Sequence, residues 1–180
     1  MIALQGEEME LVEAIEKRTS VRGFKEGEVT EEFVMEMLRL GMLAPSAGNL
    51  QARDFIVVRE PGIKAKLSQA AFGQEFVESA PVVVVCCANL ARIRNYGSRG
   101  LELYCLQDVA ASVQNMLLYV ASQGLGACWV GAFDEMQASR VLGLPENVRP
   151  VVILPIGVPE ESPRRTPRLK LDMVVHREKW

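Results

Sequence analysis

The chain has 180 residues, a formal net charge of −3, 49% hydrophobic residues and 24% charged residues. This length and composition predict a single globular domain with a buried core, and they exclude an intrinsically disordered chain. The mildly acidic balance, with basic residues confined to local clusters, argues against binding to nucleic acid, which requires a broad basic face.

The first part of the chain predicts two surface helices and a turn. Apolar residues recur at helical spacing across residues 10–19, which is typical of a helix with one buried face. A second helix begins after Thr30, since two glutamates occupy its first turn, where the helix dipole favours negative charge. The segment APSAGN at 44–49 then ends this helix.

Strands and helices alternate through the rest of the chain. We expect strands at 54–60, 81–89 and 149–157, and a strand with a turn at 127–133. We expect helices at 62–72, 101–123 and 134–142, the last one capped by Asp134. The strand at 81–89 is apolar throughout and should be buried on both faces. The helix at 101–123 is apolar on nearly all sides, so it must be enclosed within its own domain or against a partner subunit. The alternation predicts an α/β or α+β sandwich around one central mixed sheet.

The last part of the chain, residues 158–180, predicts a C-terminal extension. Its prolines forbid a helix at first, and it ends in the strand-like segment LDMVVH at 171–176. The extension carries apolar residues that a finished core cannot take, so we expect it to wrap around a second subunit. Packing against its own domain is the alternative. Residues 1–180 are therefore expected to form one domain.

The sequence lacks the usual catalytic motifs. His176 is the only histidine, so neither a serine–histidine–aspartate triad nor a histidine-rich metal site is predicted. A P-loop motif is absent. The segment GLGACWVG at 124–131 imitates a dinucleotide fingerprint in the wrong order, because it follows a helix and enters a strand. We assign no catalytic side chain and no metal ligand, and we expect a bound cofactor to bring the reactivity.

The sequence also predicts a cytoplasmic location. The four cysteines show no CxxC spacing and are interpreted as reduced core thiols: Cys86, Cys87, Cys105 and Cys128. The N-terminus turns acidic within its first residues, which argues against a signal peptide. Charged or amide residues interrupt every apolar stretch, which argues against a membrane span.

A cationic stretch at 17–24, KRTSVRGF, is the first candidate binding element. Arg18 and Arg22 are four residues apart with Ser20 between them, so two guanidinium groups and a hydroxyl can converge on one phosphate. Arginines of the extension can close the same site from the other end of the chain: Arg164, Arg165 and Arg168. The alternative is a solvated basic turn at the end of a helix.

Five segments in this order resemble the FMN-dependent nitroreductase family: KRTSVRGF, APSAGNLQ, GLGACWVGAF, VVILPIGVP and the terminal VVHREKW. The resemblance covers residues 17–180. It implies a three-layer α+β sandwich that forms an intertwined homodimer, with FMN held tightly but non-covalently at the subunit interface. It also implies a ping-pong reaction. NAD(P)H gives hydride to flavin N5, and a small electron acceptor, such as a nitroaromatic or a quinone, then takes the electrons.

The resemblance assigns cofactor-binding roles by position. The phosphate and ribityl contacts match Arg18, Thr19, Ser20, Arg22 and, from the extension, Arg168. The extension has PRLKL where family members often carry RKP, which makes Arg165 and Lys170 alternatives to Arg168. The turn that reaches the flavin from the other subunit matches Pro45, Ser46, Ala47 and Asn49. Gln74 lies near a family position that contacts the flavin ring or the ribityl group. Gly131 and Ala132, with Val130 before them, match the main chain whose N–H points at flavin N5.

Other interpretations stay open at this point. Tyr96, Arg99 and Tyr104 are candidates for lining the substrate pocket, with a plain surface loop as the alternative. A flavin-dependent dehalogenase or flavin-cleaving relative would differ in the reaction, and a flavin-binding or delivery protein would show little turnover. A deazaflavin could replace FMN, or a small anion-binding α/β protein could hold no flavin.

Overall fold

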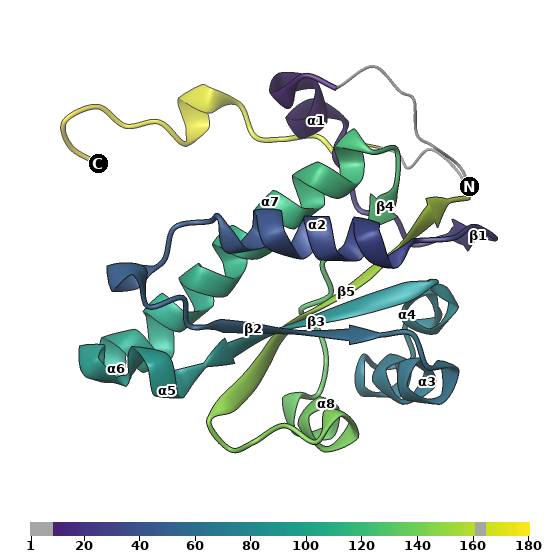
Figure 1. The fold of residues 1–180 in the computed structure, drawn as a ribbon. Coiled ribbons are helices and arrows are strands. Elements are labelled where there is room, and N and C mark those ends of the chain that lie inside the picture. The colour runs from purple at the N-terminus through teal and green to yellow at the C-terminus, as the bar shows by residue number, and fades with distance from the viewer. Residues whose placement is uncertain (1–8, 161–164) are drawn as a thin grey trace.

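The computed structural model describes residues 9–160 and 165–180, and its elements form a three-layer sandwich (Figure 1). The main helices are α1 (Leu11–Lys17), α2 (Glu31–Met42), α3 (Pro61–Ala70), α4 (Glu75–Ser79), α7 (Cys105–Ser122) and α8 (Glu135–Leu142). Helices α2 and α7 cover one face of the sheet, with α1 packed against α7, and α3, α4 and α8 cover the other face.

The sheet has five strands: β1 (Phe24–Lys25), β2 (Arg53–Val58), β3 (Val82–Asn89), β4 (Gly126–Ala127) and β5 (Val148–Pro159). Their order is β1-β5-β3-β2, and β4 also pairs with β5. All of these pairs are antiparallel. The sequence predicted a mixed sheet. Within the described residues, the one parallel contact is an isolated bridge between Ser20 and Ala127.

The central strand β3 divides the interior into two cores, because successive side chains of a strand point to opposite faces. Val82, Val84, Cys86 and Ala88 pack with α2 and α7, whereas Val83, Val85 and Cys87 pack with α3, α4 and α8. The predicted burial of this strand on both faces is confirmed. The predicted thiols are also confirmed, since all four cysteines are free and buried.

The predicted helix starts are confirmed by side-chain caps. Thr30 Oγ1 accepts a hydrogen bond from the Phe33 N–H at 3.2 Å, and Asp134 Oδ1 accepts one from the Gln137 N–H at 2.9 Å. Each cap satisfies a main-chain donor that the first helical turn leaves without a partner. The two helices therefore begin at residues that the sequence marks.

The long apolar helix is confirmed as α7, and one face of it is buried in its own domain. Val109, Val113 and Met116 are fully buried against the sheet. Short turns precede it: α5 (Leu90–Ile93), η2 (Arg94–Tyr96), α6 (Gly97–Arg99) and the π-helical η3 (Gly100–Tyr104). Within the described ranges, no helix combines the length and the apolar character that a membrane crossing requires.

The strand with a turn predicted at 127–133 is confirmed in part. Only β4 pairs continuously with β5, and Val130 then makes an isolated bridge to Ile153. Between these pairings, the Cys128 N–H donates to the Pro155 carbonyl at 3.3 Å. Proline has no N–H to return that bond, so the ladder breaks at Cys128. The break frees the following residues for a loop.

The strand-like segment predicted at 171–176 is wrong. Residues 171–173 form a short 3₁₀ turn, η4 (Leu171–Met173), and the residues around it are exposed. Figure 1 shows this part of the C-terminal extension running away from the body of the domain. A strand needs a neighbouring strand for its main-chain hydrogen bonds, and the described residues of one chain offer none here.

Candidate functional site

Arginines line a cavity of about 340 Å³ between the end of α1 and the C-terminal extension. Arg18 and Thr19 follow α1, whereas Arg165 and Arg168 come from the extension. The volume lies within the range of small-molecule pockets, and the planar fork of arginine suits phosphate oxygens. The structure thus brings together the two basic clusters of the sequence, and we call this space the arginine cavity.

The alternatives in the extension differ in their placement. Arg168 Nη1 donates to the carbonyl and the hydroxyl of Thr166, both at 2.9 Å, which orients its guanidinium. Arg165 lines the same cavity, whereas Lys170 is exposed and does not. Arg164 lies outside the described residues. Glu16 also lines the arginine cavity, so its carboxylate reduces the positive potential at one side.

Main-chain hydrogen bonds fix the basic stretch on both sides of the arginine cavity. The Arg18 N–H donates to the Ala14 carbonyl at 2.9 Å, which ends α1, and the Val21 N–H donates to the Ala127 carbonyl at 3.0 Å. Gly126 permits this approach, because a Cβ at that position would lie only 2.6 Å from Val21 Cγ2. The stretch is therefore held along β4 by backbone contacts rather than by its charges.

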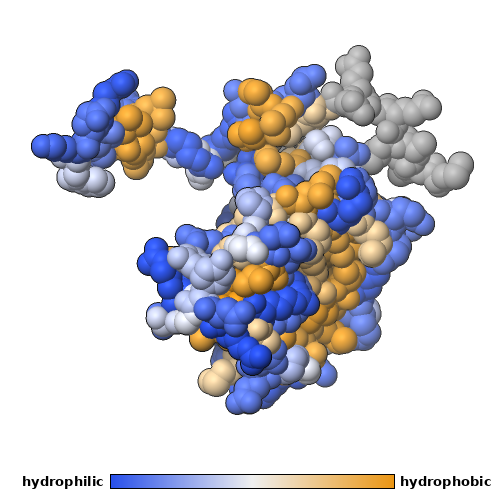
Figure 2. Space-filling model, turned by 60° about the vertical axis from the view of Figure 1, so that its left-hand side comes forward, coloured by the Kyte–Doolittle hydropathy of each residue, from blue (hydrophilic) through white to orange (hydrophobic). Residues whose placement is uncertain are grey.

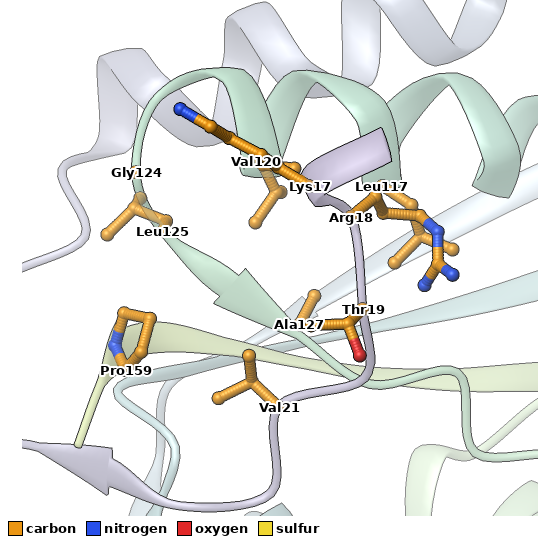
Figure 3. Close-up of a pocket in the computed structure, with 11 residues that line it drawn as sticks. Lys17, Arg18, Thr19, Val21, Leu117, Val120, Gly124, Leu125, Ala127 and Pro159 are labelled. Atoms are coloured by element: carbon orange, nitrogen blue, oxygen red, sulfur yellow. The ribbon is translucent and has the colours of Figure 1, made fainter. Parts of the chain in front are cut away.

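A second, smaller cavity of about 130 Å³ lies between this stretch and the end of α7 (Figure 3). Leu117, Val120 and Leu125 supply apolar walls, and the volume falls below the usual range for a ligand pocket. Figure 3 shows the side chains of Lys17 and Arg18 extending in different directions. Lys17 instead pairs with Glu13 within α1. Arg18 is thus the cation of this pair that serves the arginine cavity.

Ser20 and Arg22 lie at a different place from Arg18. They do not line the arginine cavity, and both side chains lie close to the Cys128 thiol. Burial raises the pKa of Cys128, and the charge of Arg22 and the polar groups of both residues oppose that rise. The structure therefore divides the basic stretch into one part facing the extension and one part facing the segment after β4.

Gln74 and Ala132 are brought together although 58 residues separate them. Gln74 Nε2 donates to the Ala132 carbonyl at 3.1 Å and to the Ala71 carbonyl at 2.9 Å. The Asp134 N–H donates to the Ala70 carbonyl at 2.8 Å. These bonds attach the loop after β4 to the end of α3, so two predicted ring-side residues share one junction.

The other two residues predicted near the ring differ in exposure. Val130 is buried by its pairing with Ile153, each N–H donating to the other's carbonyl at 3.0 Å. Gly131 is exposed, and a Cβ there would meet only Trp129, at 3.5 Å from Nε1. The main chain of Gly131 is therefore accessible to a ligand.

The predicted turn at Pro45, Ser46, Ala47 and Asn49 lies away from the arginine cavity. The Ala47 N–H donates to Asp108 in the first half of α7, whereas Leu117 and Val120 adjoin Arg18. A helix rises 1.5 Å per residue, so the two places are about 13–18 Å apart along α7. One chain does not unite the turn with the arginine cavity.

Two buried charged residues at this turn were not identified from the sequence. Arg53 and Asp108 are 2% and 3% exposed. The sequence did contain a clue to this pair, because an aspartate inside a helix that is otherwise apolar requires a partner.

The turn at 44–52 also lies close to Tyr96, since a Cβ on Gly48 would lie 2.5 Å from the Tyr96 hydroxyl oxygen. Tyr96 thus lies beside the turn instead of on a detached surface loop.

An α+β sandwich with a cationic cavity at its edge and open main chain after β4 defines a protein suited to a small anionic ligand. The nitroreductase family model matches residues 15–78 and 64–158. The chain belongs to the nitroreductase family. This finding confirms the resemblance on which the site residues were assigned.

The chain is similar to known proteins over most of its length. A Methanothermobacter thermautotrophicus protein, provisionally named an NADH dehydrogenase/NAD(P)H nitroreductase, is 34% identical over 96% of this chain and 88% of its own. The NADH dehydrogenase of Thermus thermophilus is 32% identical over 88% of this chain and 91% of its own. The structure of the NADPH:FMN oxidoreductase from Vibrio harveyi, complexed with NAD⁺, superposes with a TM-score of 0.88 at 29% identity, covering 94% of this chain and 77% of that one.

The described residues fit a phosphorylated flavin on two observations. The arginine cavity supplies at least three guanidinium groups at one edge, which suits a phosphate. Gly131 offers exposed main chain beside which, among the described residues, only Trp129 comes within 4 Å of a Cβ, and this suits close approach of a flat ring. The donor set and the open main chain thus agree with the cofactor that the family uses.

Proposed function

We propose that this chain is an NAD(P)H-dependent FMN oxidoreductase that reduces a small acceptor, such as a nitroaromatic or quinone, by a ping-pong mechanism. When bound, FMN would supply the hydride and electron transfer chemistry between the nicotinamide and the acceptor. Membership of the nitroreductase family supports the enzyme class and the cofactor. The observation that carries the proposal is the arginine cavity, where the two ends of the chain supply cations to one place.

The residues of this chain have distinct proposed roles. Arg18, with Arg168 and Arg165, binds the phosphate through charge-assisted hydrogen bonds, and Thr19 contributes at the same cavity. Ser20 and Arg22 point toward the segment after β4 and hold the ribityl chain. The main chain at Gly131 and Ala132 donates toward the ring, whereas the Val130 N–H already bonds the Ile153 carbonyl. Gln74 fixes that segment by its bond to Ala132. No described side chain is required as an acid or base.

We further propose that two copies of the chain complete each site. The turn at 44–52 and the arginine cavity lie too far apart along α7 to serve one ligand within a single chain. A second copy would bring its own turn to the cavity of the first. The site would then belong to both subunits of a homodimer.

Exposed apolar residues support this assembly. Leu11, Val12 and Ile15 on α1 are 64%, 67% and 53% exposed, and Leu171 and Trp180 in the extension are 77% and 99% exposed. Figure 2 shows apolar residues both on the projecting extension and on the nearby face of the body. Exposed large apolar residues gathered in this way are typical of an interface. We propose that each chain forms a single domain and that its residues 158–180 wrap around the other copy.

We also propose a cytoplasmic location, which is consistent with the free thiols of the four cysteines.

The test is the absorbance spectrum of the purified protein after incubation with FMN and desalting, followed by anaerobic titration with NADH and with NADPH. We expect a retained flavin that either nicotinamide bleaches, and steady oxidation of the nicotinamide with menadione or a nitrofuran. A protein that retains no FMN would contradict the cofactor assignment. Retained flavin that neither nicotinamide reduces would instead indicate a flavin-binding or delivery protein.

A further inference from the structure

The turn at 44–52 contains an unusual concentration of left-handed backbone. Gly48, Asn49 and Gln51 have φ values of 55°, 55° and 51°. Glycine and asparagine adopt this conformation readily, whereas glutamine does so only under constraint. Residues in sparsely populated backbone regions persist when their surroundings fix them. The fold must therefore supply contacts that hold this turn.

Arg53 supplies contacts on one side of the turn. Its Nη2 donates to the carbonyls of Met42 at 2.8 Å and Ala44 at 2.7 Å, and its Nη1 donates to the Pro45 carbonyl at 3.2 Å. Nη1 also reaches the main-chain carbonyl of Asp108 at 3.3 Å. One guanidinium thus binds the incoming arm of the turn to helix α7.

Asp108 supplies contacts on the other side of the turn. Its Oδ1 accepts from the Ala47 N–H at 2.9 Å, and its Oδ2 accepts from the Ala52 N–H at 3.2 Å. One carboxylate therefore joins the start and the end of the left-handed segment. A further bond, from the Gln51 N–H to Ser46 Oγ at 3.0 Å, lies within the segment.

Burying the charged side chains of Arg53 and Asp108 costs free energy, so we expect them to serve a purpose beyond packing. Charged side chains are seldom fully buried, and replacement of a buried charged pair by apolar residues is often neutral or stabilising. Burial lowers the pKa of Arg53, and the charge of Asp108 opposes that effect. Four of the six hydrogen bonds of the two groups go to the main chain of the 44–52 turn. Their position indicates that the conformation of the turn is what they preserve.

We propose that Arg53 and Asp108 are positioning residues that hold the 44–52 turn in the shape required to contact the flavin bound by the partner subunit. This inference rests on the proposed function. Neither residue touches the cofactor. Each acts through the main chain of the turn, where Pro45, Ser46, Ala47 and Asn49 are the groups presented.

The test compares Asp108→Asn and Arg53→Lys with a matched control, Lys64→Gln. Asparagine keeps one acceptor but turns an amide N–H₂ toward the other main-chain donor, and lysine keeps the charge but loses the fork. Lys64 is also a buried cation bound to a main-chain carbonyl, that of Ala80 at 2.6 Å. It lies in α3 on the opposite face of the sheet, so its variant reports the loss of a buried polar contact alone.

The measured quantities are the dissociation constants for FMN and for riboflavin, the visible circular dichroism of the bound flavin, and the melting temperature. Loss of a residue that supports a bound group typically weakens binding about 10–100-fold. We expect both turn variants to weaken FMN and riboflavin by the same factor, about 10-fold or more, because the turn does not hold the phosphate. The dichroism of the flavin should change as well. The control should leave both affinities and the dichroism unchanged at a similar melting temperature.

Amide hydrogen exchange at Ala47 and Ala52 provides a second readout without flavin, and it should accelerate in Asp108→Asn. The inference is overturned if the turn variants bind flavin like the parent protein, or if Lys64→Gln weakens binding to the same extent. A parent protein that binds no FMN would overturn both this inference and the proposed function. That outcome is recognised from the parent protein alone, before any variant is compared.

Discussion

Substitution of Gly131 tests the proposed ring site with little disturbance of the fold. A Cβ at this position would lie 3.5 Å from Trp129 Nε1 and 3.8 Å from Cδ1, which are ordinary van der Waals distances. The backbone of Gly131 is outside the left-handed region that only glycine adopts readily. Gly131→Ala and Gly131→Val are therefore compatible with the folded chain, and any functional loss should come from the space that the new side chain takes.

The magnitude follows from two opposite effects. Replacing glycine by alanine at a permitted backbone conformation stabilises a protein by about 0.4–1 kcal/mol, because the unfolded chain loses freedom. For a domain of this size, the melting temperature of Gly131→Ala should rise by about 1–4 °C. The isopropyl group of Gly131→Val should displace a ring that approaches the main chain, and a misplacement of about 1 Å can lower a rate about 100-fold.

The assay is stopped-flow reduction of the bound flavin by NADH and NADPH, combined with thermal unfolding of the flavin-free protein. Gly126→Ala serves as the matched control in the same segment. Its Cβ would lie 2.6–2.8 Å from Val21 side-chain atoms, so overpacking should cost about 1–3 kcal/mol of stability. The reasoning is refuted if Gly131→Val reduces flavin at the parent rate, or if Gly131→Ala unfolds as easily as Gly126→Ala.

Further outcomes are expected at the cavity, at a helix start and in the core. Arg18→Ala combined with Arg22→Ala should weaken FMN binding by at least about 10-fold per lost charged contact with little change in melting temperature, and unchanged flavin content would contradict the assignment. Hydrogen bonds from the Gly62 and Ile63 N–H groups hold the pKa of Glu60 below 4.5. This stabilisation is present above that pH and is lost as the pH falls through the lower folded pKa. Thermal melts of Glu60→Gln and the parent should therefore differ at pH 7 and converge as the pH falls below the folded pKa of Glu60; a constant difference would count against this account. Burial raises the pKa of Cys87 to about 12, so a thiol reagent at pH 8 should label no cysteine rapidly until denaturant exposes all four.

Some elements of the fold could be predicted because the decisive signal lies within a few residues. Thr30 and Asp134 mark helix starts through short side chains that cap their own first turns. The apolar run of β3 predicts burial on both faces without knowledge of its neighbours. By contrast, the end of β4 depends on Pro155, which lies opposite Cys128 only after two distant segments pair. The strand predicted at 171–176 failed for a related reason, since a strand exists only where a second strand is available.

The candidate site shows the same division. The sequence by itself determined the residue types for a phosphorylated flavin: two arginines and a serine near the start, a second basic cluster near the end, and a small-residue segment between them. Local spacing and the family pattern are sufficient for that much.

Only the tertiary structure decided how those residues are grouped. It places Arg18 with Arg165 and Arg168, places Arg22 with Cys128, and separates the 44–52 turn from both. It also shows that Arg53 and Asp108 hold this turn. The physical reason is that a buried charge is compensated by partners that are distant along the chain, and the packing of α7 on the sheet selects those partners.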